Sequence, residues 1–142
     1  MVVVLIIAIL IAIAIPQFLG ARSRAQDAGA KSDIRNALTA EKTSYVDTQK
    51  YTATTATLAA IEPGLKWNVA GGPNVTVGDV VAGDGNVVCI TDTSKSGTVF
   101  SLADIAVSGT SITAGTYYLK GACSTSATAI TAGTGGWSTT AW

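Results

Sequence analysis

Histidine is absent from this chain of 142 residues, and its absence removes a whole class of chemistry. Without an imidazole there is no histidine general base, no His-ligated metal and no histidine pH switch. The serine, threonine and cysteine side chains lack the base that most often activates such nucleophiles, and no lysine is convincingly placed to replace it. We therefore expect a protein that is not an enzyme and that carries no cofactor.

Charge is also scarce. Charged residues make up 13% of the chain, against about 25% in soluble domains. The nine basic residues balance the nine acidic ones, so the formal net charge is zero. Proteins that bind nucleic acids usually carry a clustered basic excess, so we expect no nucleic acid as an intrinsic ligand. The low charge and the mean hydropathy of +0.41 predict a chain that buries much of itself against something else.

Only two cysteines occur, Cys89 and Cys123, and both lie in the second half of the chain. They allow a single intramolecular pairing. If this part of the protein lies outside the cytoplasm, a disulfide is the favoured interpretation, and closing the loop would contribute roughly 3–4 kcal/mol. The alternative is a pair of buried free thiols.

What the sequence has in place of charge is an unbroken apolar run from Met1 to Ile15. In lipid or in a dry helix bundle, a helix satisfies the backbone of such a segment internally. The run is shorter than the roughly 20 residues that span a bilayer, so it predicts part of a span or a segment that leans on partners. A cleaved signal peptide is the alternative, but no basic region precedes the run and Ala21-Arg22-Ser23 is a poor cleavage site.

Helical patterning continues beyond the apolar run. Small apolar residues recur three or four apart from Phe18 to Ala28, and bulkier ones continue the stripe from Ile34 to Tyr45. Together these segments predict one helix of about 50 residues, about 75 Å long. A globule of this size cannot bury such a rod, so part of the helix must protrude and be sheltered by other molecules.

Pro16 interrupts the predicted helix. It removes one backbone donor, and its ring crowds the carbonyl group of Ala12. Gly20 lowers helix propensity again one turn later. We predict a kink or a locally extended stretch within residues 12–20; whether the proline only bends the helix or marks a functional melting point stays open.

The stretch MVVVLIIAILIAIAIPQFLGARSRAQ resembles the N-terminal helix of type IV pilins. The Val-rich start, the Ile-Pro-Gln-Phe junction and the Ala-Arg-Ser continuation carry the resemblance, which covers the predicted helix. In the family, a basic leader and a Phe-Thr-Leu-Ile-Glu-Leu-like segment precede this stretch, and neither has a match here. We therefore expect the native subunit to begin upstream of Met1, since about six more apolar residues would give a run of about 21 that spans a membrane.

Composition and resemblance together predict an α+β, pilin-like fold. A long N-terminal helix, kinked near Pro16, packs its second half against a small antiparallel sheet. Residues 1–28 form a protruding hydrophobic helix. Residues 29–142 form a head that comprises the second half of the helix (29–50), a connecting loop (51–74), and the sheet with a C-terminal disulfide region (75–142).

Four short strands are expected in the head, from residue composition and turn signals. Asp84-Gly85 is a good hairpin turn between the first two, and a Gly-Gly-Pro turn precedes the first. Residues 124–142 are expected to form a surface loop, an extra strand or a subunit contact. The expected strands are Val75–Val81, Asn86–Thr91, Val99–Val107 and Thr116–Lys120.

The resemblance implies a structural subunit that waits in the cytoplasmic (inner) membrane, with a methylated N-terminus. A prepilin peptidase processes it, and an assembly ATPase with a platform protein adds it to a helical, extracellular homopolymer. Adhesion, twitching motility or DNA uptake would belong to the assembled fibre. The residues expected to pack in the polymer are Val4, Ile7, Ile9, Leu10, Ile13, Pro16 and Phe18.

Two other functions stay open. A pseudopilin of a type II secretion system shares the helix, although the cysteine pair and the lack of an acidic C-terminal cluster argue against it. A minor pilin or membrane-anchored adhesin would differ by a concave pocket with converging polar groups.

Three weaker signals remain. Asn74-Val75-Thr76 fits the N-glycosylation pattern. Four aspartates could include a calcium ligand or two, although they lack EF-hand spacing; they are Asp79, Asp84, Asp92 and Asp104. Five aromatic residues are candidates for a binding patch, although core or interface packing is the favoured interpretation; they are Trp67, Tyr117, Tyr118, Trp137 and Trp142.

Overall fold

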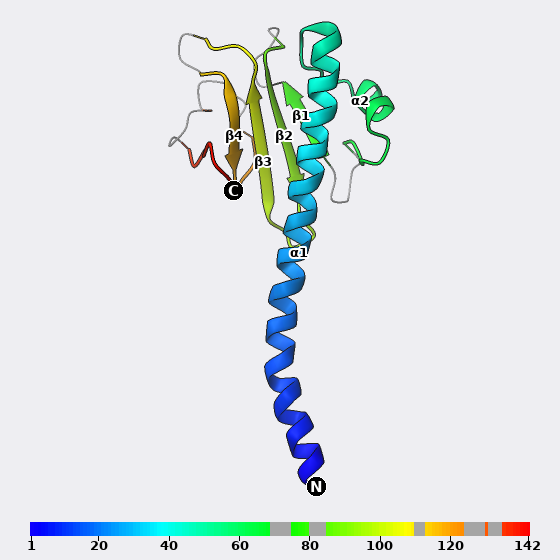
Figure 1. Cartoon of the computed structure of the whole chain (residues 1–142), viewed down its shortest axis with the longest axis vertical. Coiled ribbons are helices and arrows are strands. Elements are labelled where there is room, and N and C mark those ends of the chain that lie inside the picture. The colour runs from blue at the N-terminus through cyan, green and yellow to red at the C-terminus, as the bar shows by residue number, and fades with distance from the viewer. Residues whose placement is uncertain (69–74, 80–84, 110–112, 124–129, 131–134) are drawn as a thin grey trace.

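A computed structural model shows one long helix that carries a small head at its C-terminal end (Figure 1). It describes residues 1–68, 75–79, 85–109, 113–123, 130 and 135–142. The chain forms helix α1, helix α2 and four strands in sequence order. Their bounds are α1 Val2–Thr48, α2 Thr55–Ile61, β1 Val75–Asp79, β2 Val87–Thr93, β3 Val99–Ile105 and β4 Gly115–Leu119.

Helix α1 runs without interruption for 47 residues, as the sequence predicts. It continues through Pro16, so the locally extended stretch offered as one alternative is wrong. A proline costs one hydrogen bond, and a change in helix direction relieves its steric clash; the axis of α1 changes direction in the blue part of Figure 1. The helix ends at Gln49, which adopts a left-handed conformation and donates its backbone N–H to the Tyr45 carbonyl group.

The segment after α1 differs from the expected connecting loop, because residues Thr55–Ile61 form helix α2. Its Ala and Leu residues favour a helix, and Leu58 supplies an apolar anchor that is fully buried in the core beside α1. Tertiary packing of this single side chain stabilises a helix too short to persist alone. The Thr-rich composition concealed it.

The four strands form one antiparallel sheet in the order β1-β2-β3-β4. Each lies where the sequence predicts a strand, with ends shifted by one or two residues. The predicted hairpin turn includes Asp84, which lies outside the described residues; Gly85 has the positive φ expected of such a turn. The sheet presents one face to the second half of α1, which confirms the predicted α+β arrangement.

Both faces of the sheet are covered, because successive residues of a strand point to opposite sides. On one face, Val88, Ile90 and Leu102 pack with Ala30 and Ile34 of α1. The other face carries Val87, Cys89, Ala103 and Ile105, and the C-terminal segment covers it with Ile130 and Trp137. Alanines at the buried positions of α1 allow the sheet to approach the helix closely.

The C-terminal segment is tied down at three points. The expected disulfide joins Cys89 of β2 to Cys123 just beyond β4. The backbone of Ser138 exchanges two hydrogen bonds with that of Tyr118 on β4. The indole N–H of Trp142 donates to the Ser101 carbonyl group at 2.9 Å. A long N-terminal helix on a small antiparallel sheet with one disulfide is a pilin-like fold.

We predict that replacing both cysteines with serine lowers the free energy of unfolding of the head by roughly 3–4 kcal/mol, because the disulfide closes a long loop in the unfolded chain. Denaturant unfolding of the protein in detergent, with and without reductant, measures this. The wild type should lose stability on reduction and the double variant should not. Identical unfolding of the wild type in both conditions would contradict the prediction.

Candidate functional sites

The N-terminal part of α1 is the most unusual surface of the molecule. Every large apolar side chain from Met1 to Leu19 is exposed, and the least exposed, Ile7, still shows 49% of its surface. An 18-residue window of this helix has a mean hydropathy of 3.0, and none of it is buried inside the molecule. By length and composition, this helix is able to cross a membrane.

The apolar side chains surround the helix on every side instead of forming a stripe. The residues predicted to pack in a polymer are all exposed, and their spacing distributes them around the whole circumference. A helix that is hydrophobic all round needs an apolar environment on all sides. Such surroundings exist within a lipid bilayer or at the centre of a helix bundle. This set consists of Val4, Ile7, Ile9, Leu10, Ile13, Pro16 and Phe18.

The character of α1 changes twice along its length. Residues 1–19 are exposed and apolar except for Gln17, and residues 20–29 are small or polar. From Ala30 onward the helix docks on the sheet, and six of its residues up to Ser44 are buried. Arg22 and Arg24 are the first charged residues after the apolar segment. They mark the end of the segment that is nearer to the head.

The four aspartates considered as metal ligands lie in different surroundings. Asp84 and the side chain of Asp79 lie outside the described residues, as does Asn74 of the glycosylation motif. The buried Asp104 is already engaged: Tyr51 and Thr116 each donate a hydroxyl hydrogen bond to it at 2.5 Å, and the Lys42 ammonium lies 3.3 Å away. This network joins α1, β3 and β4. Burial, followed by the hydrogen bond to Asp104 and the charge of that carboxylate, raises the pKa of Tyr51.

The five aromatic residues do not form a single patch. Tyr117 and Trp137 are buried on the disulfide side of the sheet. Trp67, Tyr118 and Trp142 belong to the core on the α1 side. The ring of Trp142 contacts Tyr118 edge-on, and the cations of Lys31 and Arg35 lie over it. These contacts are those of packing residues that hold the chain terminus on the helix.

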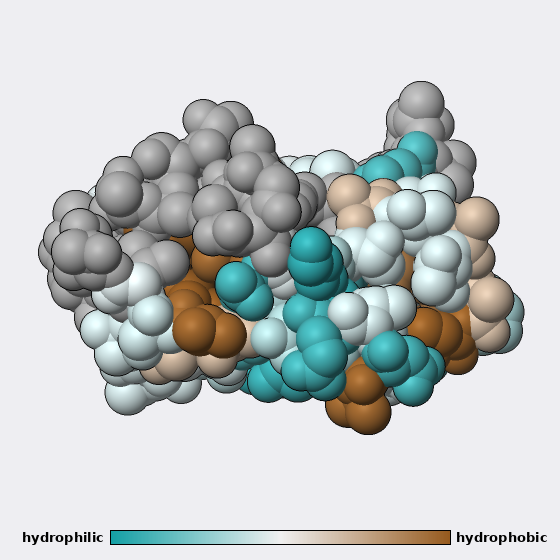
Figure 2. Space-filling model, turned by 90° about the horizontal axis from the view of Figure 1, so that it is seen from above, coloured by the Kyte–Doolittle hydropathy of each residue, from teal (hydrophilic) through white to brown (hydrophobic). Residues whose placement is uncertain are grey.

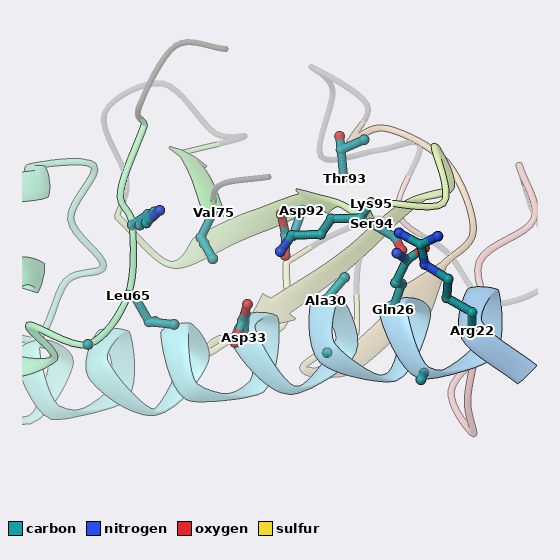
Figure 3. Close-up of a pocket in the computed structure, with 14 residues that line it drawn as sticks. Arg22, Gln26, Ala30, Asp33, Leu65, Val75, Asp92, Thr93, Ser94 and Lys95 are labelled. Carbon is teal, nitrogen blue, oxygen red and sulfur yellow. The ribbon is translucent and has the colours of Figure 1, made fainter. Parts of the chain in front are cut away.

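A cleft of about 510 Å³ lies where α1 meets the end of β2 (Figure 3). One wall is α1, which contributes a line of residues one helical turn apart. The end of β2 and the β2–β3 turn form the opposite wall. One end is closed by Leu65, from the chain between α2 and β1, and by Val75, the first residue of β1. The polar groups that line the cleft include Arg22, Gln26, Asp33, Asp92, Thr93 and Lys95.

Asp92 is the exceptional residue of this cleft. It is only 2% exposed, and its Oδ1 atom has no hydrogen-bond partner among the described residues. Burial, followed by the negative charge of Asp33, raises the pKa of Asp92 to about 6, against the lowering effect of a hydrogen bond with the Thr93 backbone. Partial burial also raises the pKa of Asp33, which stays accessible at the mouth of the cleft.

Positive side chains line the same cleft without neutralising this pair. Arg22, Lys66 and Lys95 all contribute to the lining. Within the described part of the chain, the ion pair found joins Lys42 to Asp104, and none reaches Asp33 or Asp92. The two carboxylates therefore share the cleft with three basic side chains, none of which lies within ion-pair distance of either carboxylate among the described residues.

Sequence reasoning named Asp92 only as one of four aspartates and did not single out Asp33. The missed signal is the period of two in β2. It places Asp92 on the same face as Val88 and Ile90, and therefore toward α1. That Asp33 of α1 lies opposite Asp92 can be recognised only when the packing of the helix on the sheet is known.

No protein-family model matches this chain, and no curated protein matches it significantly. The similarity to pilins therefore rests on the sequence of the N-terminal helix and on the pilin-like fold.

We predict that Asp92→Asn stabilises the protein at pH 7.5 by about 1–2 kcal/mol, an amount discounted for partial solvent screening. The folded pKa of Asp92, about 6, exceeds the unfolded value of about 3.9. The stability that its proton contributes is therefore full below about pH 4 and is lost as the pH rises through about 6.

Denaturant unfolding between pH 4 and 8, in detergent with EDTA, measures this difference. The stability of the Asn variant relative to wild type should be near zero at pH 4 and grow toward pH 7.5. Asp47→Asn, at an exposed position near the end of α1, serves as the control. A constant offset between Asp92→Asn and wild type across this range would show that the carboxyl group titrates normally.

Proposed function

We propose that this protein is a structural subunit of a type IV pilus, which polymerises through its N-terminal helix into a filament on the cell surface. The supporting observation is the exposed apolar segment of α1. Fourteen large apolar side chains between Met1 and Leu19 face outward. At about 1 kcal/mol for completing the burial of each half-exposed side chain, sheltering them is worth on the order of 10–20 kcal/mol.

A polymer of identical subunits accounts for the distribution of these side chains. If several copies align their apolar segments at the centre of a fibre, each helix has apolar neighbours on all sides. A dimer would shelter only a stripe, and the segment has no polar stripe to leave in water. Before assembly, the same segment fits the cytoplasmic membrane, where lipid replaces the neighbouring subunits.

The head is suited to the outside of such a fibre. Seen from above the free end of the head, polar and neutral residues predominate on the described surface, and apolar ones are scattered among them (Figure 2). The disulfide and the two-sided core stabilise a small sheet that would otherwise be marginal. An oxidised cysteine pair is typical of proteins exposed outside the cytoplasm.

A second candidate function has one specific observation in its favour. The cleft at the α1–β2 junction contains converging polar groups, the feature expected of a membrane-anchored ligand-binding protein or minor pilin. In that case the apolar helix would serve as an anchor alone. Negative-stain electron microscopy of cell-surface fibres, with mass spectrometry of their main subunit, distinguishes the two: only a pilin makes up most of a fibre.

We predict that Ile9→Asp abolishes fibre formation and leaves the head folded, because a carboxylate among packed apolar helices costs several kcal/mol. Fibres are counted by electron microscopy, and head folding is checked by circular dichroism and disulfide content of the protein in detergent. Ile9→Val, which keeps the position apolar, should assemble normally. Abundant fibres built from the Asp variant would rule out helix-driven polymerisation.

A further inference from the structure

We propose that the cleft at the α1–β2 junction binds a calcium ion, with Asp33 and Asp92 as its carboxylate ligands. Asp92 is almost fully buried and leaves Oδ1 without a hydrogen-bond partner in the described chain. In Figure 3, Asp33 rises from α1 toward the sheet, and Asp92 lies above it at the end of β2. A buried carboxylate that faces a second carboxylate is destabilising unless a cation joins them.

The donors favour a hard cation that tolerates irregular geometry. Only oxygen donors are at hand, because the chain has no histidine and both cysteines form the disulfide. Besides the two carboxylates, the cleft offers the amide oxygen of Gln26, which lines it from α1. Calcium takes six to eight oxygen ligands, including water, whereas magnesium demands a near-ideal octahedron. A cleft of about 510 Å³ has room for the ion and several waters.

The two carboxylates lie at different depths in the cleft, so an ion from solution can reach them one after the other. Asp33 is exposed at the mouth, and Asp92 lies deep between helix and sheet. An entering ion meets the outer carboxylate first and then bridges to the inner one. Binding would join α1 to β2 at the point where the helix leaves the head, and would therefore stabilise that junction.

Lys95 offers the competing explanation. It lines the cleft and extends along β2 toward Asp92 in Figure 3, although no ion pair between them is found. If Lys95 folds over Asp92 in solution, the chain supplies its own cation and no metal is needed. The two explanations predict opposite effects for Lys95→Gln: it removes a competitor from a calcium site, but it removes the only partner from a lysine-neutralised aspartate.

The experiment uses the full chain in non-ionic detergent, first in EDTA and then with calcium up to 10 mM at constant ionic strength. A site with two carboxylates should have a Kd on the order of 1 mM. At tenfold excess over that Kd, calcium should raise the Tm of the head by about 4 °C. Magnesium at the same concentration should give a smaller shift.

Four variants make the result specific. Asp92→Asn and Asp33→Asn should lose the calcium shift, and Asp47→Asn should keep it. Lys95→Gln should bind calcium several-fold more tightly than wild type. Terbium luminescence excited through Trp67, which pairs with the cleft residue Val75, should appear in wild type, be displaced by calcium and be lost in Asp92→Asn.

The proposal is overturned if the wild type shows no shift at 10 mM calcium, or if Asp92→Asn responds as strongly as wild type. It is also overturned if Lys95→Gln lowers the Tm in EDTA while the wild type ignores calcium, since Lys95 is then the neutralising group. Because all readouts use detergent-dispersed subunits, they do not depend on whether the protein forms fibres.

Discussion

The structure depends on one constraint: a single helix must satisfy two environments. From Ala30 to Ser44, α1 covers one face of the sheet and contributes four side chains to the core on that side. From Met1 to Leu19 the same helix offers apolar side chains at every position but Gln17, and the head cannot reach back to cover them. Because α1 is one continuous helix, it holds the apolar segment away from the head. The head is thus a self-sufficient fold attached to a segment that other molecules must bury.

The arrangement of the sheet follows from this constraint. With α1 on one face, the other face would be open to water, and the C-terminal segment covers it. Trp137 fills that side, and the Cys89–Cys123 disulfide fixes the end of β4 to the centre of the sheet. Trp142 then returns to the α1 side, where Lys31 and Arg35 lie over its ring. The C-terminal segment therefore contributes to the cores on both faces of the sheet.

Most of the fold could be predicted because its signals are local. Each signal is contained within a short stretch of sequence. These signals are the apolar run, the helical spacing beyond it and the β-branched segments of the head. The two cysteines allow only one intramolecular disulfide. Two expectations failed for different reasons. The backbone around Pro16 stays helical, since a proline costs one hydrogen bond and a bend relieves its clash. Helix α2 forms because Leu58 is buried in the core beside α1, a tertiary contact that the local sequence does not reveal.

The cleft could not be predicted in the same way, because it arises from register between distant segments. Asp33 and Asp92 are ordinary residues in their own elements, one on a helix and one in a strand whose alternation points it inward. Only the docking of α1 on β2 turns them into a pair of facing carboxylates. Folds place like charges together in this manner only where something offsets the repulsion, and local conflicts of this kind concentrate at functional sites. Both carboxylate oxygens of the buried Asp104 accept hydrogen bonds, one from Tyr51 and one from Thr116. Asp92 differs from Asp104 because its Oδ1 atom has no hydrogen-bond partner among the described residues, and a cation in the cleft would supply one.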